Sequence, residues 1–439
     1  MNLTFVAILM VVLIIASLFI KRVPMQYTLY IVPLFCALLL GYNFTEIGDM
    51  FIKQVNTAMK AAGYMCLFAM IYFNMLSQTG MFDTLVKGLL RITRGRINIF
   101  VVMIMTSVIA AIGMLTATVV TAYLIVFPIM LPIYKKMKFD RVSAMVIAQT
   151  SIAAMCFLPW GIAVVNSSVF AGVNALELSH RLVPVAVCFI PVIILQWFYF
   201  AFRHKKSGGL MMVEWTDADA SAEPAQQGKG PKEDYRRPKL FWFNLIVFVG
   251  VIGLLVANVM PAYMVFILAS FLTIIVDYPK PADCRKLLGQ SGNKFFNTLM
   301  MLIGISFFIG VFQETGMVQA LAEFVVNSVP QALTRYIHII LALLMVPVIR
   351  FIPNKIYNSM YPVLLAIGAT FGLAGTDVIA PFVCNMTLAT GSSPFTATTH
   401  VGTSLLELDV TEYCNKSAVI QTVTNIAIIA IAIAVGVVR

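Results

Sequence analysis

The chain contains the same pattern twice. Thr79-Gly80-Met81 recurs as Thr315-Gly316-Met317, and Tyr123…Pro128 recurs as Tyr357…Pro362 with the same internal spacing. Two prolines of the first half also have matches in the second: Pro24 with Pro261, and Pro159 with Pro394. The four matches keep one order, at offsets of 234 to 237 residues. One such match arises easily by chance, but the common order predicts an internal duplication.

Each copy has the composition of a membrane domain. Of the 439 residues, 60% are hydrophobic and only 11% are charged, and the mean hydropathy is +0.92, which excludes an ordinary soluble domain. Lys21 and Arg22 follow the first apolar run instead of preceding it, so we expect a retained helix and not a signal peptide. Several apolar runs approach or exceed the roughly 20 residues that span a bilayer, among them 3–20, 27–40, 240–256 and 417–438.

The distribution of basic residues predicts the orientation in the membrane. If Arg350 and the clusters within 21–22, 87–96, 135–141, 203–239 and 280–294 face the cytoplasm, 23 of the 30 Lys and Arg residues lie there and six lie outside. Both termini are then outside, and the first copy crosses the membrane an odd number of times. The second copy is therefore expected to be inverted. Topology also accounts for the net charge of +11 without nucleic-acid binding.

The predicted organisation has three parts. Residues 1–204 form the first inverted repeat, 205–239 a flexible cytoplasmic linker rich in Gly, Ala, Pro and alternating charge, and 240–439 the second repeat. A regulatory docking role is the alternative for the linker. The predicted fold is an all-α integral membrane protein with about 10–12 membrane helices, some of them broken. Four amphipathic stretches are interpreted as interfacial helices: 45–60, 81–92, 283–297 and 317–329.

Four polar interruptions of apolar sequence predict the binding site. Irregular backbone at membrane depth is tolerated only where it is buried or lines a water-filled cavity, and paired breaks in a duplicated chain are typical of secondary transporters. The breaks at 113–121 and 353–359 correspond to each other, as do those at 158–168 and 391–400. Their hydroxyls, amides and helix N-termini suit an anionic oxygen. The candidate substrate-binding residues are Thr116, Thr118, Thr121, Asn166, Ser167, Asn354, Lys355, Tyr357, Asn358, Ser392, Ser393, Thr396, Thr398 and Thr399.

Each candidate has a structural alternative. Ser and Thr in membrane helices commonly bond their own backbone one turn back. Lys355 either faces the substrate or extends to the interface, and His400 is either a proton carrier or a neutral structural residue. Glu314 is interpreted as a helix cap, and Glu407 with Asp409 as solvated residues near an inner helix end.

Several of these stretches resemble the citrate–metal/proton symporter family of the ion transporter superfamily. The most specific are Leu158-Pro159-Trp160-Gly161 and Thr79-Gly80-Met81-Phe82-Asp83, and the resemblance covers most of the chain outside the linker. It implies a homodimer whose scaffold domain holds a mobile, elevator-type transport domain with two re-entrant hairpins. Shorter similar stretches lie at 67–73, 130–136, 314–317, 361–364 and 393–394.

The chain departs from this family at two points. Thr116-Ala117-Thr118-Val119 stands where the family has an acidic Asp-Gly-Asp-Gly stretch, and Asn354-Lys355 stands where it has an Asn-Asp pair. Carboxylates there would suit a hard cation. Their absence argues against transport of a metal–citrate complex, and the lysine offers a positive charge in place of the lost cation.

The leading prediction is a secondary active transporter of a small organic anion, citrate or another di- or tricarboxylate, in the bacterial inner membrane. A proton or sodium ion is the candidate coupling cation, and membrane lipid and a second copy are the other expected partners. The alternatives are an anion channel or facilitator and a carrier of a different anion in the same superfamily. An enzyme is least favoured because the chain lacks an HExxH motif, an acidic metal cluster and a nucleophile elbow. The seven cysteines lack CxxC spacing and are expected to be packing residues, and no cofactor or metal site is predicted.

Overall fold

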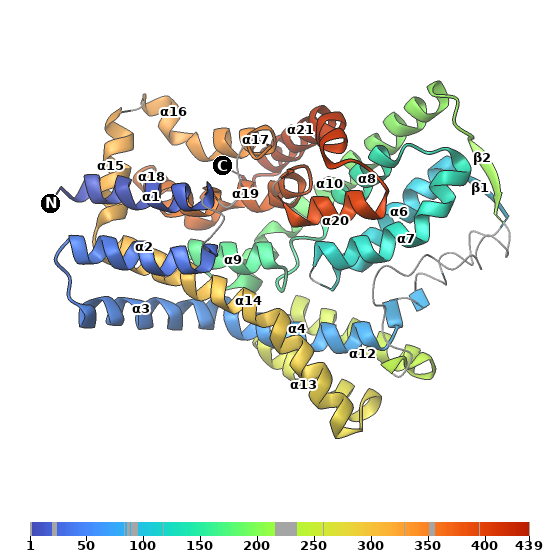
Figure 1. Cartoon of the computed structure of the whole chain (residues 1–439), viewed down its shortest axis with the longest axis horizontal. Helices are drawn as coiled ribbons and strands as arrows, with labels where there is room; N and C mark the ends of the chain where they lie inside the picture. Colours follow the sequence, from blue (N-terminus) through green and yellow to red (C-terminus); the bar gives the residue numbers. More distant parts are fainter. Residues whose placement is uncertain are drawn as a thin grey trace.

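The protein is almost wholly helical (Figure 1). The computed structural model describes residues 2–19, 24–82, 84–85, 88, 95–116, 118–215, 235–257, 259–328, 330–350, 356–394 and 396–438. In these ranges six helices are long and apolar enough to cross a membrane, and seven shorter apolar helices accompany them. The prediction of an all-α membrane protein is confirmed, with one small exception: β1 (Gly95–Asn98) pairs antiparallel with β2 (Met212–Trp215).

The order of long and short helices in the first half recurs in the second. The first half contains α1 (Leu3–Phe19), α2 (Met25–Leu39), α3 (Phe44–Ala58), α4 (Tyr64–Gln78), α6 (Ile99–Met114), α7 (Val119–Met137), α8 (Arg141–Ala154), α9 (Ile162–Ala171) and α10 (Ala175–Lys206). The second contains α12 (Phe241–Ala257), α13 (Ala262–Asp277), α14 (Pro281–Glu314), α15 (Met317–Ser328), α16 (Gln331–Arg335), α17 (Ile337–Val348), α18 (Ile356–Thr370), α19 (Gly375–Thr390), α20 (Ala397–Leu405) and α21 (Val410–Ala434).

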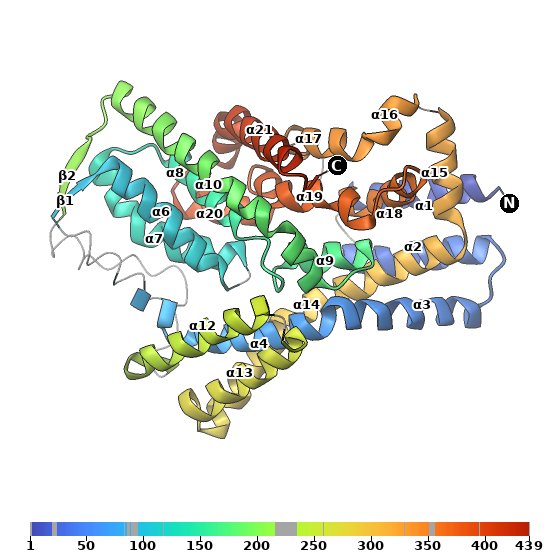
Figure 2. The same ribbon diagram turned by 180° about the vertical axis from the view of Figure 1, so that it is seen from behind.

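Helices at matching positions exchange partners between the halves. We call two elements or residues about 235 positions apart counterparts. α2 packs on α14 while its counterpart α13 packs on α4, and α7 packs on α20 while α18 packs on α9. α8 contacts its own counterpart α19, and α10 contacts α21. Figures 1 and 2 show α6, α7 and α20 at one end of the molecule, and α1, α2 and α18 at the other. Such swapped contacts are expected of two copies related by a two-fold axis; their inversion in the membrane stays a prediction.

Two of the predicted interfacial helices are not separate elements, so that interpretation was wrong. Residues 45–60 belong to α3, which continues through a π-helical turn (Met59–Gly63) into α4. Residues 283–297 belong to α14, a single helix of 34 residues. Neither stretch contains a proline after its first turn, so the backbone hydrogen bonds continue, and α3 and α14 cover each other's apolar faces. The stretch 317–329 is a helix of its own, α15, and much of 81–92 lies outside the described residues.

Both described ends of the predicted linker are ordered, which corrects the expectation of a flexible chain there. At its start, β2 pairs with β1 next to α6. At its end, Tyr235 is buried, and the backbone N–H of Arg237 donates to the carbonyl of Thr79 at 2.9 Å. A 3-10 turn (Pro238–Leu240) then leads into α12. Residues 216–234 lie outside the described residues.

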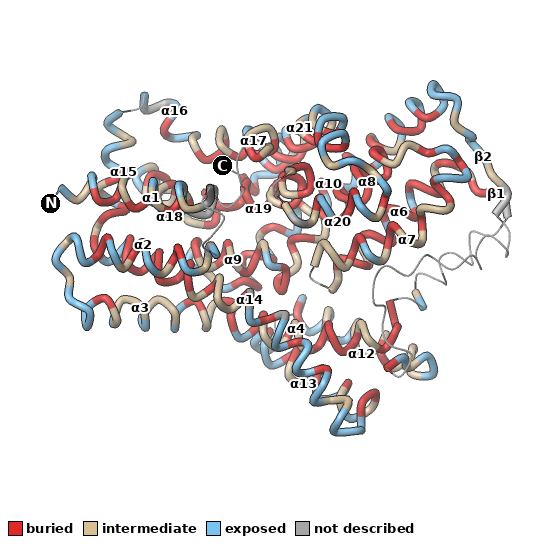
Figure 3. The backbone as a smooth tube through the Cα atoms, viewed as in Figure 1, coloured by how far each residue is buried: buried red, intermediate tan, exposed pale blue. Residues whose placement is uncertain are grey.

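The two counterparts α8 and α19 form the buried centre. Every residue from Val142 to Ala153 in α8 is buried, and nearly all of α19 is buried, whereas α12 and α13 carry many exposed residues (Figure 3). Polar side chains inside such a centre require hydrogen-bond partners. Free backbone N–H and C=O groups occur at helix ends. The ends of α8 and α19 are therefore the candidate region for a binding site.

Candidate functional site

The two central helices end in matching turns. α8 ends at Ala154 and α9 begins at Ile162, while α19 ends at Thr390 and α20 begins at Ala397. The N-cap residues of α9 and α20 are the counterparts Gly161 and Thr396, and neither supplies a side-chain cap. The first N–H groups of both helices are thus left without a capping side chain, which is the arrangement that attracts an anion.

A buried polar network joins these turns. Tyr123 OH in α7 donates to Gln149 Oε1 in α8, and Gln149 Nε2 donates to the carbonyl of Thr387 in α19. Thr387 Oγ1 in turn donates to Cys156 Sγ at 2.7 Å. A Cβ added to Gly391 would overlap the Gln149 amide, so a larger residue there would force Gln149 to move. The network holds α7, α8 and α19 in one arrangement. Sequence reasoning missed Gln149, whose signal was the one amide side chain of α8, followed directly by Thr150 and Ser151.

The first break meets the second. Trp160 Nε1, in the turn after α8, donates to the carbonyl of Leu115 at the end of α6 at 3.3 Å. Thr116 Oγ1 donates to the carbonyl of Gly113 at 2.8 Å, and Thr118 caps α7 while its Oγ1 donates to Thr121 Oγ1 at 2.6 Å. These three hydroxyls shape the break through local bonds, as the structural alternative predicts.

The fourth break contacts the end of α17, which precedes the third break. Ser393 Oγ donates to the carbonyl of Ile349 at 2.7 Å, and Thr399 Oγ1 donates to the carbonyl of Thr390 at 3.0 Å. Ser392 Oγ bonds its own helix through the carbonyl of Ala389. His400 is exposed, and its Nε2 lies 2.8 Å from the carbonyl oxygen of Pro394. His400 therefore has a local structural contact.

Four candidates retain buried oxygen atoms without a partner. They are Asn166 Oδ1 and Ser167 Oγ in α9, Thr396 Oγ1 at the N-cap of α20, and Thr398 Oγ1 in its first turn. A buried polar atom without a partner is costly, so such atoms call for a ligand or a water molecule. Two of them lie at the start of α20 and two in the second turn of its counterpart α9, so these four residues are the strongest candidates for the substrate.

Part of the third break lies outside the described residues. Asn354 and Lys355 are among those omitted, and Tyr357 and Asn358 are in the first turn of α18, where their side chains are not described. The role of Lys355 therefore stays a prediction. Within the described ranges no group of three or more His, Cys, Asp and Glu residues is placed to hold a metal ion.

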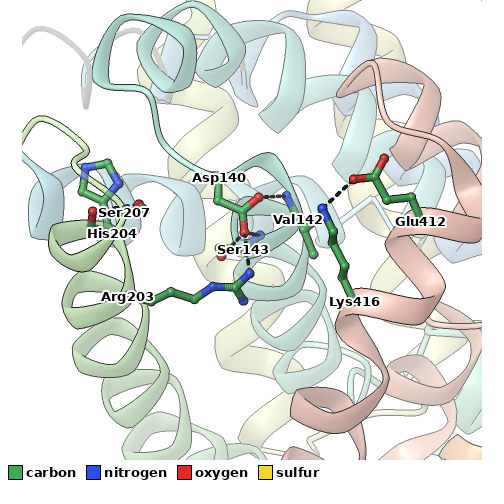
Figure 4. A network of polar contacts seen from close by, with 8 residues as sticks. All are labelled: Asp140, Val142, Ser143, Arg203, His204, Ser207, Glu412 and Lys416. Carbon is green, nitrogen blue, oxygen red and sulfur yellow. Dashed lines mark hydrogen bonds and ion pairs between the residues drawn. The ribbon is translucent and has the colours of Figure 1, made fainter.

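Charged residues gather where α8 and α21 begin (Figure 4). Asp140 caps α8, accepting from Ser143 Oγ at 2.7 Å, and lies 3.7 Å from Arg203 of α10. Lys416 pairs with Glu412 at 2.6 Å on α21, close enough to Asp140 and Arg203 for electrostatic interaction. Lys416 belonged to the six basic residues counted outside. Because Lys416 lies near Arg203, which is predicted to face the cytoplasm, Lys416 is now predicted to face the cytoplasm as well.

The carboxylates expected near helix ends have specific partners. Glu407, in the turn between α20 and α21, accepts from Lys135 at 2.7 Å and from Arg141 at 3.0 Å. The hydrogen bond from Lys135, with both cations nearby, lowers the pKa of the Glu407 carboxyl below its ordinary value. Asp409 caps α21, and Glu314 pairs with Lys53 at 2.6 Å instead of capping a helix.

A second ion pair lies at the opposite end of the central helices. Arg181 of α10 donates to Thr376 Oγ1 at 2.6 Å and is ion-paired with Asp377 in the first turn of α19. The Asp377 side chain is only 9% exposed, against 36% for Arg181. Asp377 also accepts from the backbone N–H of Ala374 in a capping interaction. This pair fixes the start of α19 much as Asp140 fixes the start of α8.

Apolar membrane helices, matching breaks around a buried polar centre and unpartnered oxygens in α9 and α20 are typical of a multi-pass membrane transporter. A sequence model described as citrate transporter matches residues 1–389, so the chain belongs to the citrate transporter family. This confirms the resemblance found in the LPWG and TGMFD stretches and excludes the enzyme alternative, since the family consists of transporters.

The similar proteins agree with this assignment. The Mg(2+)/citrate complex secondary transporter of Bacillus subtilis (strain 168) is 25% identical over 429 residues, covering 98% of this chain and 97% of that protein. A citrate transporter from the same organism is 25% identical over 360 residues, covering 82% and 81%. The solved structure of MtrF from Neisseria gonorrhoeae, titled as one of a class of antimetabolite efflux pumps, superposes with a TM-score of 0.59 at 12% identity. The superposition covers 88% of this chain and 83% of MtrF. This similarity supports the fold alone.

Proposed function

We propose that this protein is a secondary active transporter of citrate or another small di- or tricarboxylate. The similar Bacillus subtilis proteins, named as citrate carriers, support the substrate class. The observation that carries the proposal is the set of unpartnered buried oxygens on Asn166 and Ser167 within α9 and on Thr396 and Thr398 at the start of α20, two helices that both lack a side-chain cap.

These groups provide the chemistry that a carboxylate needs. The hydroxyls of Ser167, Thr396 and Thr398 donate to anionic oxygens, and the first N–H groups of α9 and α20 add two partial positive charges. The Asn166 amide orients a hydroxyl or carboxyl group of the substrate. Tyr123 and Gln149 hold the two helix starts in position without contacting the substrate. Lys355 supplies a full positive charge from the third break.

The proposed cargo is the free anion and not a metal complex. In the described residues the breaks carry hydroxyls and amides where a hard cation requires carboxylates, and no acidic cluster supports a metal ion. A proton or sodium ion is the proposed coupling cation. The same lack of carboxylates favours a facilitator as the second candidate, because a coupled carrier needs a place for its cation.

The swapped helix contacts support an alternating-access scheme between the two repeats. We propose that α6–α10 and α17–α21 move together as the transport domain, in an elevator mode, against a scaffold of the remaining helices. The closely joined pairs α8 with α19 and α10 with α21 would keep this domain rigid as it moves. Two copies of the chain are proposed to associate through the scaffold.

Binding measurements on four variants test the site. Ser167→Ala and Thr398→Val remove hydroxyls that lack a partner, so citrate affinity measured by calorimetry should fall roughly ten- to a hundred-fold, as for a hydrogen bond to a charged group. The matched controls Thr116→Val and Ser392→Ala remove hydroxyls that bond local carbonyls, and affinity should stay within about twofold. Equal effects in both groups would reject the site.

Transport measurements separate the carrier from the facilitator. Proteoliposomes loaded with buffer should concentrate radiolabelled citrate when a proton or sodium gradient is imposed. An ionophore that collapses the gradient should abolish accumulation while leaving equilibration intact. Equilibration without accumulation under every gradient would establish the facilitator instead.

A further inference from the structure

A cavity of about 610 Å³ lies beside α21, away from the polar network. The end of α17 contributes Pro347 and Arg350, the turn after α19 contributes Pro394, and one face of α21 contributes the rest, including Asn415, Val419 and Val423. The α21 residues recur at spacings of three and four, so they form one stripe along the helix. We call this space the α21 cavity.

The long wall of the α21 cavity is apolar and faces outward. Val419 is 75% exposed and Val423 is 55% exposed. In a multi-pass membrane protein, exposed apolar side chains along a spanning helix face the hydrocarbon of the bilayer. The cavity therefore opens toward lipid, and its wall suits an acyl chain better than a small polar anion.

The other end of the cavity carries an unpaired cation. Arg350 donates through one guanidinium nitrogen to Asn415 Oδ1 at 2.9 Å, while its other terminal nitrogen is buried without a partner. Among the described residues no carboxylate forms a salt bridge with Arg350, whereas Arg141, Arg181 and Arg203 each have one. A guanidinium stays charged at any physiological pH, and a half-buried charge with a free N–H group is stabilised by a hydrogen-bond acceptor, most strongly by an anionic oxygen.

The positions of cation and wall match the layout of a phospholipid. Asn415 is in the second turn of α21, in the same stretch as the ion pair of Glu412 with Lys416, which Figure 4 shows. Exposed charges of this kind are expected at the aqueous boundary of a membrane helix. Val423 lies eight residues further along the helix, about 12 Å deeper at 1.5 Å per residue. The cavity thus has a cationic end near the boundary and an apolar wall running into the membrane.

The counterpart cavity is smaller and lacks the cation. It measures about 230 Å³ and is lined by Pro159, Ser179, His180 and Val183, the counterparts of Pro394, Cys414, Asn415 and Ala418. There α12 adds Ile252, Leu255 and Val256 to the lining. The counterpart of Arg350 is Leu115. The larger volume and the cation are therefore specific to the second copy, not a by-product of the repeated fold.

We infer that the α21 cavity binds an anionic phospholipid, with a phosphate oxygen on the Arg350 guanidinium and an acyl chain along Val419 and Val423. Basic pockets between membrane helices near the cytoplasmic side are suited to such head groups. Because Pro394 of the fourth break lines the cavity, an occupied site stabilises the turn that leads into α20. Lipid binding is then coupled to the conformation of the transport domain.

Lipid binding to purified protein in neutral detergent tests this inference. Phosphatidylglycerol and phosphatidylcholine with identical acyl chains are titrated, bound lipid is counted by native mass spectrometry, and the thermal midpoint is recorded. The protein should retain phosphatidylglycerol at least tenfold better than phosphatidylcholine and melt at a higher temperature with it. Arg350→Gln should lose that preference. Arg285→Gln, which removes the same charge from an exposed position on α14, should keep it.

A second variant keeps the test valid if Arg350→Gln does not fold. Ala418→Trp fills the space along the apolar wall and leaves Arg350 in place. This variant should therefore displace the lipid although the positive charge of the cavity is unchanged. Equal phosphatidylglycerol binding in the unmodified protein and both variants would overturn the inference.

Citrate titrations of the same proteins in pure phosphatidylcholine nanodiscs distinguish the source of the anionic oxygen. Unchanged citrate affinity in Arg350→Gln agrees with a lipid site. A loss of citrate affinity with phosphatidylglycerol binding intact would identify Arg350 as a substrate ligand and overturn the lipid assignment. This inference does not depend on the proposed substrate.

Discussion

The two repeats differ most where their central helices touch. In the first repeat, Gln149 reaches across from α8 to the end of α19, and Cys156 follows in the turn. Their counterparts in the second repeat are Cys384 and Gly391, and the glycine leaves the space that the Gln149 amide occupies. Two copies that meet at a two-fold axis cannot both place a long side chain at the same crossing. The duplicated halves have therefore become complementary instead of identical.

The ends of the same helices show a second difference. Asp377 at the start of α19 is nearly buried against Arg181, whereas Asp140 at the start of α8 is 40% exposed and 3.7 Å from Arg203. A charged hydrogen bond gains strength as water is excluded. The ion pair of the second repeat should consequently contribute more to stability than that of the first.

The largest expected effect tests the inversion of the repeats. Thr45 and Ala282 are exposed residues at counterpart positions, just inside α3 and α14. Thr45→Cys should react with a membrane-impermeant maleimide added outside intact cells, and Ala282→Cys should react only after the membrane is opened, because opposite orientation puts the two on opposite sides.

The native cysteines interfere little with this measurement, since six of the seven are buried and Cys284 is half-buried. The unmodified protein serves as the background control. Reaction of both variants from the same side would show that the repeats are parallel, and the predicted topology would then be wrong.

The next-largest expected effect tests the packing of Gly391 against Gln149 at the contact between α8 and α19. Gly391→Ala should lower the free energy of unfolding by about 2–3 kcal/mol, because the new methyl group overlaps a Gln149 amide that is hydrogen-bonded on both sides. Denaturant titration in detergent measures the change. Gly250→Ala in α12, where an added Cβ meets no atom within 4 Å, should alter stability by less than about 1 kcal/mol.

A double variant shows whether the cause is steric. Gln149→Ala alone should also destabilise, since Tyr123 and Thr387 lose their partner. In the Gly391→Ala background, however, Gln149→Ala removes the overlap, so the combined loss should be smaller than the sum of the two single losses. Strict additivity would count against the packing explanation.

A smaller effect compares the two ion pairs. Asp377→Asn should cost about 1–2 kcal/mol, since it leaves a partly buried Arg181 with only Thr376, and the partial exposure of Arg181 reduces the loss. Asp140→Asn should cost less than about 1 kcal/mol, because asparagine still caps α8 and the pair is exposed. Equal losses of stability in the two variants would show that the ion pairs at the starts of α8 and α19 contribute equally.

The smallest effect concerns acid stability. The pKa of Glu407 is lowered below its ordinary value of 4.5, so its contribution is present above that value and is lost as pH falls through the lower pKa of the folded state. Glu407→Gln should reduce stability at neutral pH by less than about 1 kcal/mol, as for exposed pairs, and flatten the decline below about pH 4.5. Thermal midpoints between pH 3 and 7 measure it, with Lys135→Gln in a double-mutant cycle. An unchanged acid limb would contradict the pairing.

The sequence by itself determined the membrane class and the positions of the described helix breaks, and it predicts the duplication. Apolar runs of spanning length report burial in lipid directly, and Gly, Pro and hydroxyl clusters act on the backbone at their own positions. The matching order of Thr79-Gly80 with Thr315-Gly316 and of Pro159 with Pro394 survives divergence because each match lies at a helix end.

Only the tertiary structure decided which polar residues are satisfied. Thr116 and Thr398 look alike in sequence, yet one hydroxyl bonds a carbonyl one turn back and the other is buried without a partner. Arg350 was assigned to the cytoplasmic clusters by its charge, and only the fold shows that it lines the α21 cavity. Hydropathy and local pattern describe what each segment contains. Which group meets which depends on contacts between residues more than 200 positions apart, such as Gln149 with Thr387, and those contacts exist only once the helices have packed.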